Sequence, residues 1–384
     1  MSVASESVQV GRKVSSVKWL SGFAAAELGA DSRLLASGTW DDRENRLQVW
    51  MVEGPKRERF AEKATLASPT LLHTVSIQPS ITAIEALPEN RLVVSTGDGA
   101  VHLYYLDEVS LTPTLRRSWE GLHRPMPNPA VDGGPAGPDH QCECTAVAAP
   151  AEDGEHIATG GEDGVINYFG LDMLEVRSPD EYGRYRVNWS TSENGELGDC
   201  AIRSIAFRNR DELLSGDSLG QLQQWDTRQK SSLGAVVTMH SEQKHSVIND
   251  IAVHPSHNYS VAAADGDGSV VIWDVRHPVY PQSNTAAHRA DVPEVWKVRF
   301  NPVRPDHLFT AGEDGALVHW DTSGGDGAGL APPPRVGRSF AIGGDVDVKG
   351  LTEECLGINA LDVEPELVAY GCDEEKLVVV VPAY

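Results

Sequence analysis

Long hydrophobic runs and basic side chains are both scarce in this chain of 384 residues. The longest apolar run, residues 377–381, has five members, whereas a helix that crosses a bilayer needs about 20. The first thirty residues lack an apolar segment behind a basic start, so we expect no secretory signal. Lys and Arg number 32 against 56 Asp and Glu, a net charge of −24. The sequence therefore predicts neither membrane insertion nor direct binding to nucleic acid, whose phosphates attract clustered cations.

Cysteine is also rare, with five scattered residues. An odd number without a disulfide framework indicates reduced thiols in a cytosolic or nuclear protein. Cys142 and Cys144 would share one face of a strand, but no second Cys/His pair has the spacing of a zinc site. Residues 265–269 begin like a calcium loop, yet Val270 stands where that loop needs glycine. The Gly-rich turns lack a Walker lysine. We therefore expect no metal and no cofactor.

Repeated hairpins dominate the sequence. The clearest copy, residues 308–321, reads as a strand of small residues, an Asp-Gly turn and an alternating strand that ends in Trp320-Asp321. Glycine suits such a turn because it accepts φ > 0. Trp273 lies 47 residues before Trp320, and Trp225 lies another 48 residues upstream. Weaker copies bring the total to seven: 35–50, 92–104, 157–169 and 368–380. Short alternating runs precede the seven hairpins: 14–19, 81–87, 144–148, 202–207, 248–253, 295–300 and 358–363.

A period of 40–48 residues with Trp-Asp closing the third strand is typical of WD-repeat propeller blades. The sequence therefore predicts an all-β protein, a single seven-bladed WD-repeat β-propeller over residues 1–384. The last copy ends without a fourth strand, so we expect the alternating segment within residues 1–12 to complete that blade and close the ring. Closure removes exposed sheet edges. The Pro/Gly-rich segments 121–141 and 322–338 are predicted to be flexible insertions.

One copy carries a constellation that could be mistaken for a hydrolase triad: His288, Thr310, Asp314 and Trp320. In WD-repeat folds these positions form a structural tetrad that ties the strands of a blade together. Other copies lack a member of the tetrad, since Ala263 stands in place of the hydroxyl residue in one copy and Leu219 in place of the acid in another. Two copies keep partial sets, Thr159 with Asp163 and Ser37 with Asp41. We therefore interpret the tetrad as structural and predict no enzymatic activity.

Acidic residues recur in the turn between the second and third strands of six copies: Asp42, Asp98, Glu162, Asp217, Asp265 and Glu313. Aspartate suits turns, and surplus charge keeps a protein soluble, which is one interpretation. The other is an electronegative rim that steers a basic segment of a partner. The sequence leaves both open.

Several segments, taken in order, are similar to one family: 38–50, 161–169, 218–228, 295–302, 306–310, 358–363 and 370–373. They resemble the forty-three-kilodalton WD-repeat nucleoporins of the Y-shaped scaffold complex in the nuclear pore. The resemblance implies a non-catalytic scaffold subunit at the nuclear envelope that docks on an α-solenoid nucleoporin and supports transport of mRNA and protein. It also implies partners among the other nucleoporins of that complex, kinetochore association in the mitosis of animal relatives, and a monomer when the chain is isolated.

Two Trp-Asp-x-Arg boxes, residues 225–228 and 273–276, suggest a different class of function. Substrate receptors of cullin-type ubiquitin ligases carry such a box at the end of a blade's third strand. The box is short and common among WD-repeat proteins, and its arginine can also cap the strand end. A ligase substrate receptor is therefore the alternative to the scaffold.

Overall fold

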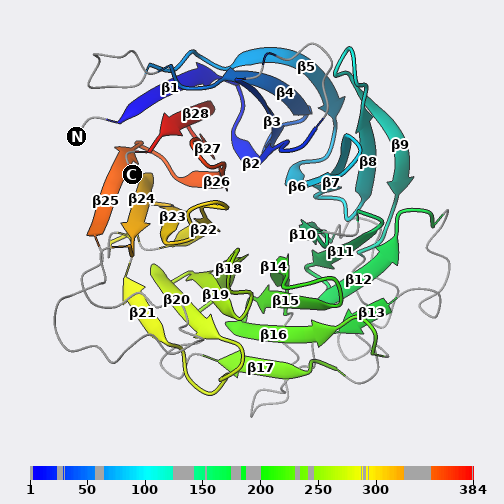
Figure 1. Cartoon of the computed structure of the whole chain (residues 1–384). Helices are drawn as coiled ribbons and strands as arrows, with labels where there is room; N and C mark the ends of the chain where they lie inside the picture. The colour runs from blue at the N-terminus through cyan, green and yellow to red at the C-terminus, as the bar shows by residue number, and fades with distance from the viewer. Residues whose placement is uncertain are drawn as a thin grey trace.

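The computed structural model describes these residues: 3–23, 29, 31–56, 65–123, 142–151, 154–173, 183–186, 200–229, 234–240, 246–286, 288, 291–292, 294–323, 347–382 and 384. They form seven four-stranded antiparallel sheets around a central opening (Figure 1). No helix occurs within these ranges. The prediction of an all-β, seven-bladed WD-repeat propeller is confirmed.

Three blades make up the first part of the ring. Blade 1 consists of β2 (Val14–Trp19), β3 (Ser32–Thr39), β4 (Asn45–Glu53) and β5 (Thr70–Ile77). Blade 2 consists of β6 (Ile81–Leu87), β7 (Arg91–Thr96), β8 (Val101–Leu106) and β9 (Pro113–Trp119). Blade 3 consists of β10 (Cys144–Ala148), β11 (His156–Gly161), β12 (Val165–Gly170) and β13 (Gly183–Arg186).

Four blades complete the ring. Blade 4 consists of β14 (Ile202–Phe207), β15 (Glu212–Asp217), β16 (Gln221–Asp226) and β17 (Val237–His240). Blade 5 consists of β18 (Ile248–Val253), β19 (Ser260–Asp265), β20 (Ser269–Asp274) and β21 (Ser283–Ala286). Blade 6 consists of β22 (Val295–Phe300), β23 (His307–Gly312), β24 (Ala316–Asp321) and β25 (Asp347–Glu353). Blade 7 consists of β26 (Ile358–Val363), β27 (Val368–Cys372), β28 (Lys376–Val381) and β1 (Ala4–Gln9).

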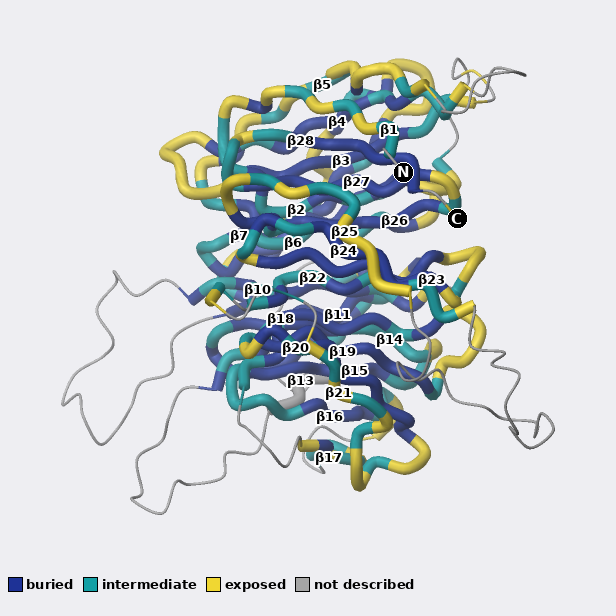
Figure 2. Tube along the Cα trace, turned by 90° about the vertical axis from the view of Figure 1, so that its left-hand side faces the viewer, coloured by how far each residue is buried: buried dark blue, intermediate teal, exposed yellow. Residues whose placement is uncertain are grey.

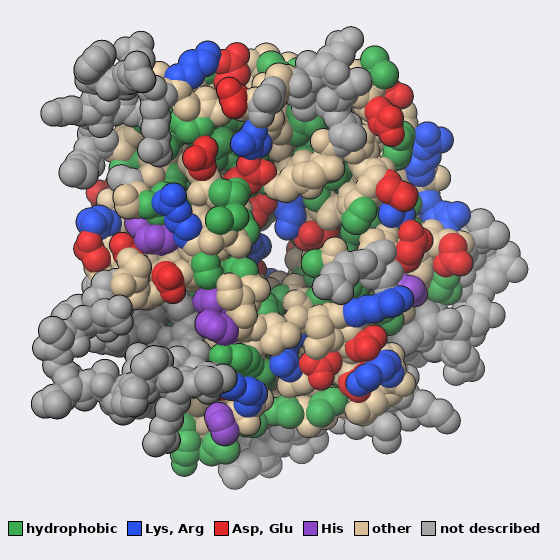
Figure 3. Space-filling model, viewed as in Figure 1, with side chains coloured by type: hydrophobic (Ala, Val, Ile, Leu, Met, Phe, Trp, Pro, Cys, Tyr) green, Lys and Arg blue, Asp and Glu red, His purple; other side chains and the backbone are tan. Residues whose placement is uncertain are grey.

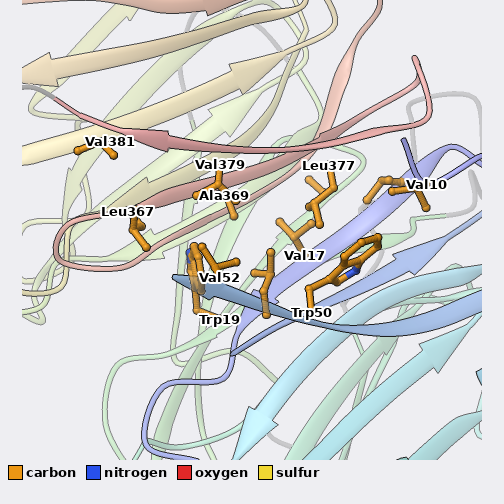
Figure 4. Close-up of a cluster of buried hydrophobic side chains, with 13 residues drawn as sticks. Val10, Val17, Trp19, Trp50, Val52, Leu367, Ala369, Leu377, Val379 and Val381 are labelled. Atoms are coloured by element: carbon orange, nitrogen blue, oxygen red, sulfur yellow. The ribbon is translucent and has the colours of Figure 1, made fainter. Parts of the chain in front are cut away.

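The N-terminal strand closes the last blade, as predicted. β1 pairs with β28 over six residues, from Ala4 opposite Val381 to Gln9 opposite Lys376. A buried apolar cluster joins this blade to blade 1, with Trp19 and Trp50 of blade 1 packed in one group with Leu367, Leu377 and Val379 of blade 7 (Figure 4). The two ends of the chain are therefore held in one sheet, and the seam is packed like an ordinary contact between blades.

The first strand of each blade lies nearest the axis, and each is in contact with the first strands of its two neighbours around the whole ring. Burial is greatest in the inner strands and falls toward the fourth strands, such as β21 and β25 (Figure 2). Every first strand carries a register shift against its second strand directly after its first residue. A bulge at this position increases the local twist and redirects the residues that follow. It therefore fixes which side chains face the central channel.

Candidate functional sites on the propeller

The predicted tetrad of blade 6 forms a closed chain of hydrogen bonds. His288 lies before β22, Thr310 lies on β23, Asp314 lies in the turn after it, and Trp320 lies on β24. The imidazole contacts the carboxylate of Asp314 through Nδ1 at 2.8 Å and the hydroxyl of Thr310 through Nε2 at 3.0 Å. Trp320 Nε1 donates to the same hydroxyl at 3.1 Å.

All four side chains of this tetrad are buried. Thr310 Oγ1 accepts the indole N–H, so its own proton is directed toward His288 Nε2. Asp314 also accepts the backbone N–H of Ala316 at 3.0 Å, which holds the turn. The hydroxyl is therefore occupied on both sides and shielded from solvent. Such an arrangement serves to tie the strands, because a nucleophile needs open space beside it.

A second set of the same kind occurs in blade 3, and the sequence analysis recovered only part of it. His123 lies 2.9 Å from Asp163 Oδ1 through Nδ1 and 2.9 Å from Thr159 Oγ1 through Nε2. The side chains of His123 and Asp163 are fully buried. Phe169 replaces the tryptophan, so no indole reaches the hydroxyl.

His123 was missed because it lies within the predicted insertion 121–141. The histidine precedes its threonine by 36 residues here and by 22 residues in blade 6. The Leu122-His123 pair just after β9 was the available signal, since a buried leucine and histidine fit a folded turn better than a solvated loop. Residues 124–141 and 324–338, the rest of the two predicted insertions, lie outside the described part, so their flexibility stays a prediction.

The partial set of blade 1 is not formed as predicted. Trp50 Nε1 donates to Ser37 Oγ at 2.9 Å, just as Trp225 Nε1 donates to Ser215 Oγ at 2.8 Å. Asp41, however, sits at φ 61° in the turn and pairs with Lys13 Nζ at 2.8 Å. The turn geometry directs this carboxylate outward, away from the hydroxyl that it was expected to join.

Three of the six acidic turn residues bind their own turns. Asp217 Oδ1 accepts the N–H groups of Leu219 and Gln221 at 2.9 and 2.8 Å. Asp265 Oδ1 accepts two turn N–H groups at 3.0 Å each. Both residues are buried, at 1% and 9% exposure, and burial raises the pKa of Asp217. Asp98 accepts the hydroxyl proton of Thr96 at 2.6 Å. The side chains of these three residues are thus engaged by their own turns.

The other three predicted rim residues remain nearer the surface. Asp42 is exposed and forms an ion pair with Arg12. Glu162 accepts the backbone N–H of Glu143 at 3.1 Å, and Glu313 accepts the indole N–H of Trp296 at 2.8 Å. Asp42, Glu162 and Glu313 are therefore the three predicted rim residues whose carboxylates do not bind the N–H groups of their own glycine turns.

In both Trp-Asp-x-Arg boxes, the arginine folds back onto the aspartate of its own box. Arg228 donates to Asp226 through Nε and Nη2, each at 2.9 Å, and these hydrogen bonds lower the pKa of that carboxyl to about 2. Arg276 reaches Asp274 at 2.9 and 2.6 Å and stacks over the ring of Tyr259 at 3.4 Å. These contacts fit arginines that cap the ends of third strands.

Within the described ranges, no three His, Cys, Asp or Glu side chains are grouped as a metal site would require, and no helix is long and apolar enough to cross a membrane. Burial raises the pKa of the Cys142 thiol to about 12, so it is a poor nucleophile at neutral pH.

Comparisons with known proteins agree with this architecture. The WD domain, G-beta repeat model matches residues 236–274, which cover β17 to β20. Nucleoporin Nup43 of Mus musculus and of Homo sapiens are each 28% identical over 323 residues, which cover 82% of this chain and 75% of the relative. The nuclear pore complex protein nup43 of Dictyostelium discoideum is 24% identical over 226 residues, 57% of this chain and 49% of the relative. The resemblance inferred from the sequence is thereby confirmed, and the chain is a WD-repeat β-propeller protein related to the Nup43 nucleoporins.

Proposed function

We propose that the chain is a non-catalytic scaffold subunit of the nuclear pore that binds other nucleoporins, among them an α-solenoid subunit of the Y-shaped complex. One observation carries the proposal: the similarity to the Nup43 nucleoporins extends over 82% of the chain, so it includes most of the blades. In this position the propeller supports the transport of mRNA and protein through the pore. Its nuclear pore localisation follows from the same relationship.

The polar clusters support a scaffold rather than an enzyme. In the sets around His288 and His123, every imidazole nitrogen has a partner inside the protein. Leaving a buried polar group without such a partner costs about 1–3 kcal/mol of folding stability. The contribution of these residues to stability is therefore sufficient to explain their presence without a catalytic role. A rigid, closed ring then offers its turns and outer strands for docking.

The three surface acids of the rim provide a candidate docking face. Asp42, Glu162 and Glu313 lie in turns between second and third strands, so all three are at one end of the ring. Charges on a rim act mainly on association rate and its salt dependence. Reversal in the double variant Glu162→Lys, Glu313→Lys is expected to slow association with a basic partner segment and to flatten the salt dependence.

Glu108 provides the matched control for these reversals. It is exposed and follows the third strand of blade 2, so it lies at the opposite end of the ring. Glu108→Lys should leave the association rate unchanged. If the double variant and this control associate at the same rate as the unmodified chain, the rim does not steer the partner.

Affinity capture from cells at the native expression level tests the proposal directly. Co-purification of outer-ring nucleoporins with an α-solenoid subunit supports the scaffold, whereas recovery of a ligase adaptor and a cullin without them supports the substrate receptor. The double variant Arg228→Ala, Arg276→Ala should change the captured set only in the second case. Because both arginines are already paired with their own aspartates, we expect no change.

A further inference from the structure

The central channel is basic, although the protein as a whole is strongly acidic. A cavity of about 90 Å³ lies on the axis and is lined by the first strands of all seven blades. Four cations and three carboxylates line it: Lys18, Arg203, Lys297 and Arg299 with Glu85, Asp250 and Asp362. Basic side chains are visible at the edge of the central opening in Figure 3. The lining thus carries a net positive charge in a chain of net charge −24.

The charges near blades 1, 2 and 7 are matched within the protein. Lys18 pairs with Glu85 at 3.1 Å. Asp362 accepts the backbone N–H of Trp19 at 2.8 Å, and its charge helps to raise the pKa of Lys18 against the effect of burial. This side of the channel has one cation and two carboxylates, so it leaves no cation in excess and one negative charge more than it needs.

On the side formed by blades 4, 5 and 6, the lining residues carry more positive than negative charge, although the charge of Arg203 also acts on Glu143, which lies outside the lining. Asp250 Oδ2 accepts both Arg299 Nη1 and the backbone N–H of Val298, the latter at 3.0 Å, and Oδ1 accepts the hydroxyl of Ser204 at 3.3 Å. Its oxygens are therefore already engaged. In the described part of the chain, Arg203 and Lys297 form no ion pair and no side-chain hydrogen bond.

The unpaired cations repel one another. Burial lowers the pKa of Lys297, and the charges of Arg299 and Arg203 lower it further, while Asp250 opposes them. Arg203, Lys297 and Arg299 carry three positive charges against one negative charge on Asp250. The charges of Asp362 and Glu85 also act on Arg299, so the lining as a whole has one positive charge in excess. Arg203 and Lys297 are half-buried, and a charge that is partly removed from water without a partner carries a cost, so an anion bound at this place would offset the repulsion.

The channel also has room for an anion at this level. The residue just after the bulge is small in five of the seven first strands: Ser16, Ala83, Ala146, Ser204 and Ala360. Asp250 and Lys297 occupy the same position in blades 5 and 6. The small side chains leave the axis open beside Lys297, and a cavity of about 90 Å³ exceeds the roughly 10–15 Å³ that one water needs.

We propose that the channel binds a small tetrahedral oxyanion of the phosphate or sulfate type between Arg203 and Lys297. The guanidinium offers two parallel N–H donors and the ammonium offers a point charge, which is the usual combination for such anions. Because the two cations come from blades 4 and 6, the bound anion joins blades that are not neighbours and stabilises the ring.

The test uses the full chain and inorganic phosphate. Isothermal titration is performed in a chloride buffer of matched ionic strength, and thermal unfolding is followed in parallel. We expect saturable phosphate binding and a rise of the thermal midpoint. Arg203→Gln and Lys297→Met should each weaken the apparent affinity at least about tenfold, and Lys297→Arg should retain it. Lys349→Met removes an exposed cation of blade 6 and is the control.

Two results would overturn the proposal. One is the absence of saturable binding at millimolar phosphate. The other is an equal loss of the phosphate effect in Lys349→Met, because general screening of surface charge would then explain it. A folding defect in Arg203→Gln does not obscure the outcome, since Lys297→Met relieves a repulsion. That variant should be at least as stable as the unmodified chain in chloride while losing its response to phosphate.

Discussion

Replacing Gly216 with alanine tests how neighbouring blades pack. Gly216 lies on β15 of blade 4, where a Cβ atom would come within 2.5 Å of Cγ2 and 3.0 Å of Cβ of Ile248. Ile248 begins β18 of blade 5 and is buried. The same contact recurs where Gly38 faces Ile81 and where Gly160 faces Ile202, each again at 2.5 Å. Glycine is therefore needed for the close approach of one blade's second strand to the next blade's first strand.

The expected cost follows from that distance. Real Cβ atoms essentially never approach another heavy atom below 3.0 Å, so one of the two strands must shift. Ile248 lies directly before the bulge of β18, where both sheets constrain it. Overpacking of a filled core costs about 1–3 kcal/mol. Restricting the unfolded chain returns about 0.4–1 kcal/mol for a Gly→Ala change. We therefore expect Gly216→Ala to lower the free energy of unfolding by roughly 1–2 kcal/mol.

Urea unfolding followed by tryptophan fluorescence measures this change. Gly350→Ala is the matched control, because a Cβ atom at Gly350 on the outer strand β25 would have no atom within 4 Å. That control should be neutral or slightly stabilising. Ile248→Ala costs about 2–5 kcal/mol alone, but combined with Gly216→Ala it should cost less than the sum, since the clashing methyl is gone. Strictly additive costs, or equal stability of Gly216→Ala and Gly350→Ala, would refute the packing argument.

Three further predictions concern the closure, the tetrad and pH. Deleting residues 1–12 removes β1 and exposes the edge of β28, so the thermal midpoint should fall sharply in calorimetry; an unchanged melt would mean that the seam holds without this strand. Asp314→Ala leaves His288 without its acceptor and should lower the free energy of unfolding by about 1–3 kcal/mol, whereas Asp42→Ala at the exposed rim should change it far less; equal effects would contradict the structural role. Burial lowers the pKa of His254 to about 4 from its ordinary value of 6.5, so the unfolded chain takes up this proton first and the contribution to stability, complete above pH 6.5, is lost as the pH falls toward 4. His254 Nδ1 accepts the backbone N–H groups of Ser256 and His257, and Asn301 Oδ1, at the equivalent position of the next blade, accepts the two corresponding N–H groups. His254→Asn should therefore keep the stability at pH 7 and reduce the slope of unfolding free energy between pH 6.5 and 4; an unchanged slope would assign the pH dependence elsewhere.

The strands were predictable because alternation and turn chemistry are local. The run 248–253 was expected as a first strand and is β18, and the run 295–300 is β22. Closure by residues 1–12 was predictable as well, since a seventh blade with three strands needs a fourth to cover its edge. These inferences use residues that are neighbours in sequence, or a count of strands, and neither depends on where distant side chains meet.

The polar contacts were harder to predict because they join residues that loops separate. The set of His123 depends on an insertion that changes its distance in sequence from Thr159 without changing the contact in space. Asp250 is a similar case. The sequence predicts that this acid lies on a first strand. Only the arrangement of the blades in a ring places it beside Arg299 of the next blade and Ser204 of the previous one. The charged lining of the channel therefore forms only when the blades are arranged in a closed ring, and the sequence of a single repeat does not predict it.

The direction of the acidic turn residues, in contrast, follows from a local rule that can be extracted from the structure. Asp217 and Asp265 stand three residues before a glycine with positive φ, Gly220 or Gly268, and each caps its turn. Glu162 and Glu313 stand two residues before such a glycine, at 164 and 315. In those two blades the following aspartate takes the N–H groups of the turn, as Asp314 does. The glutamate is then free of the turn N–H groups. In these four blades, the number of residues between the acid and its glycine therefore decides whether the acid binds its own turn.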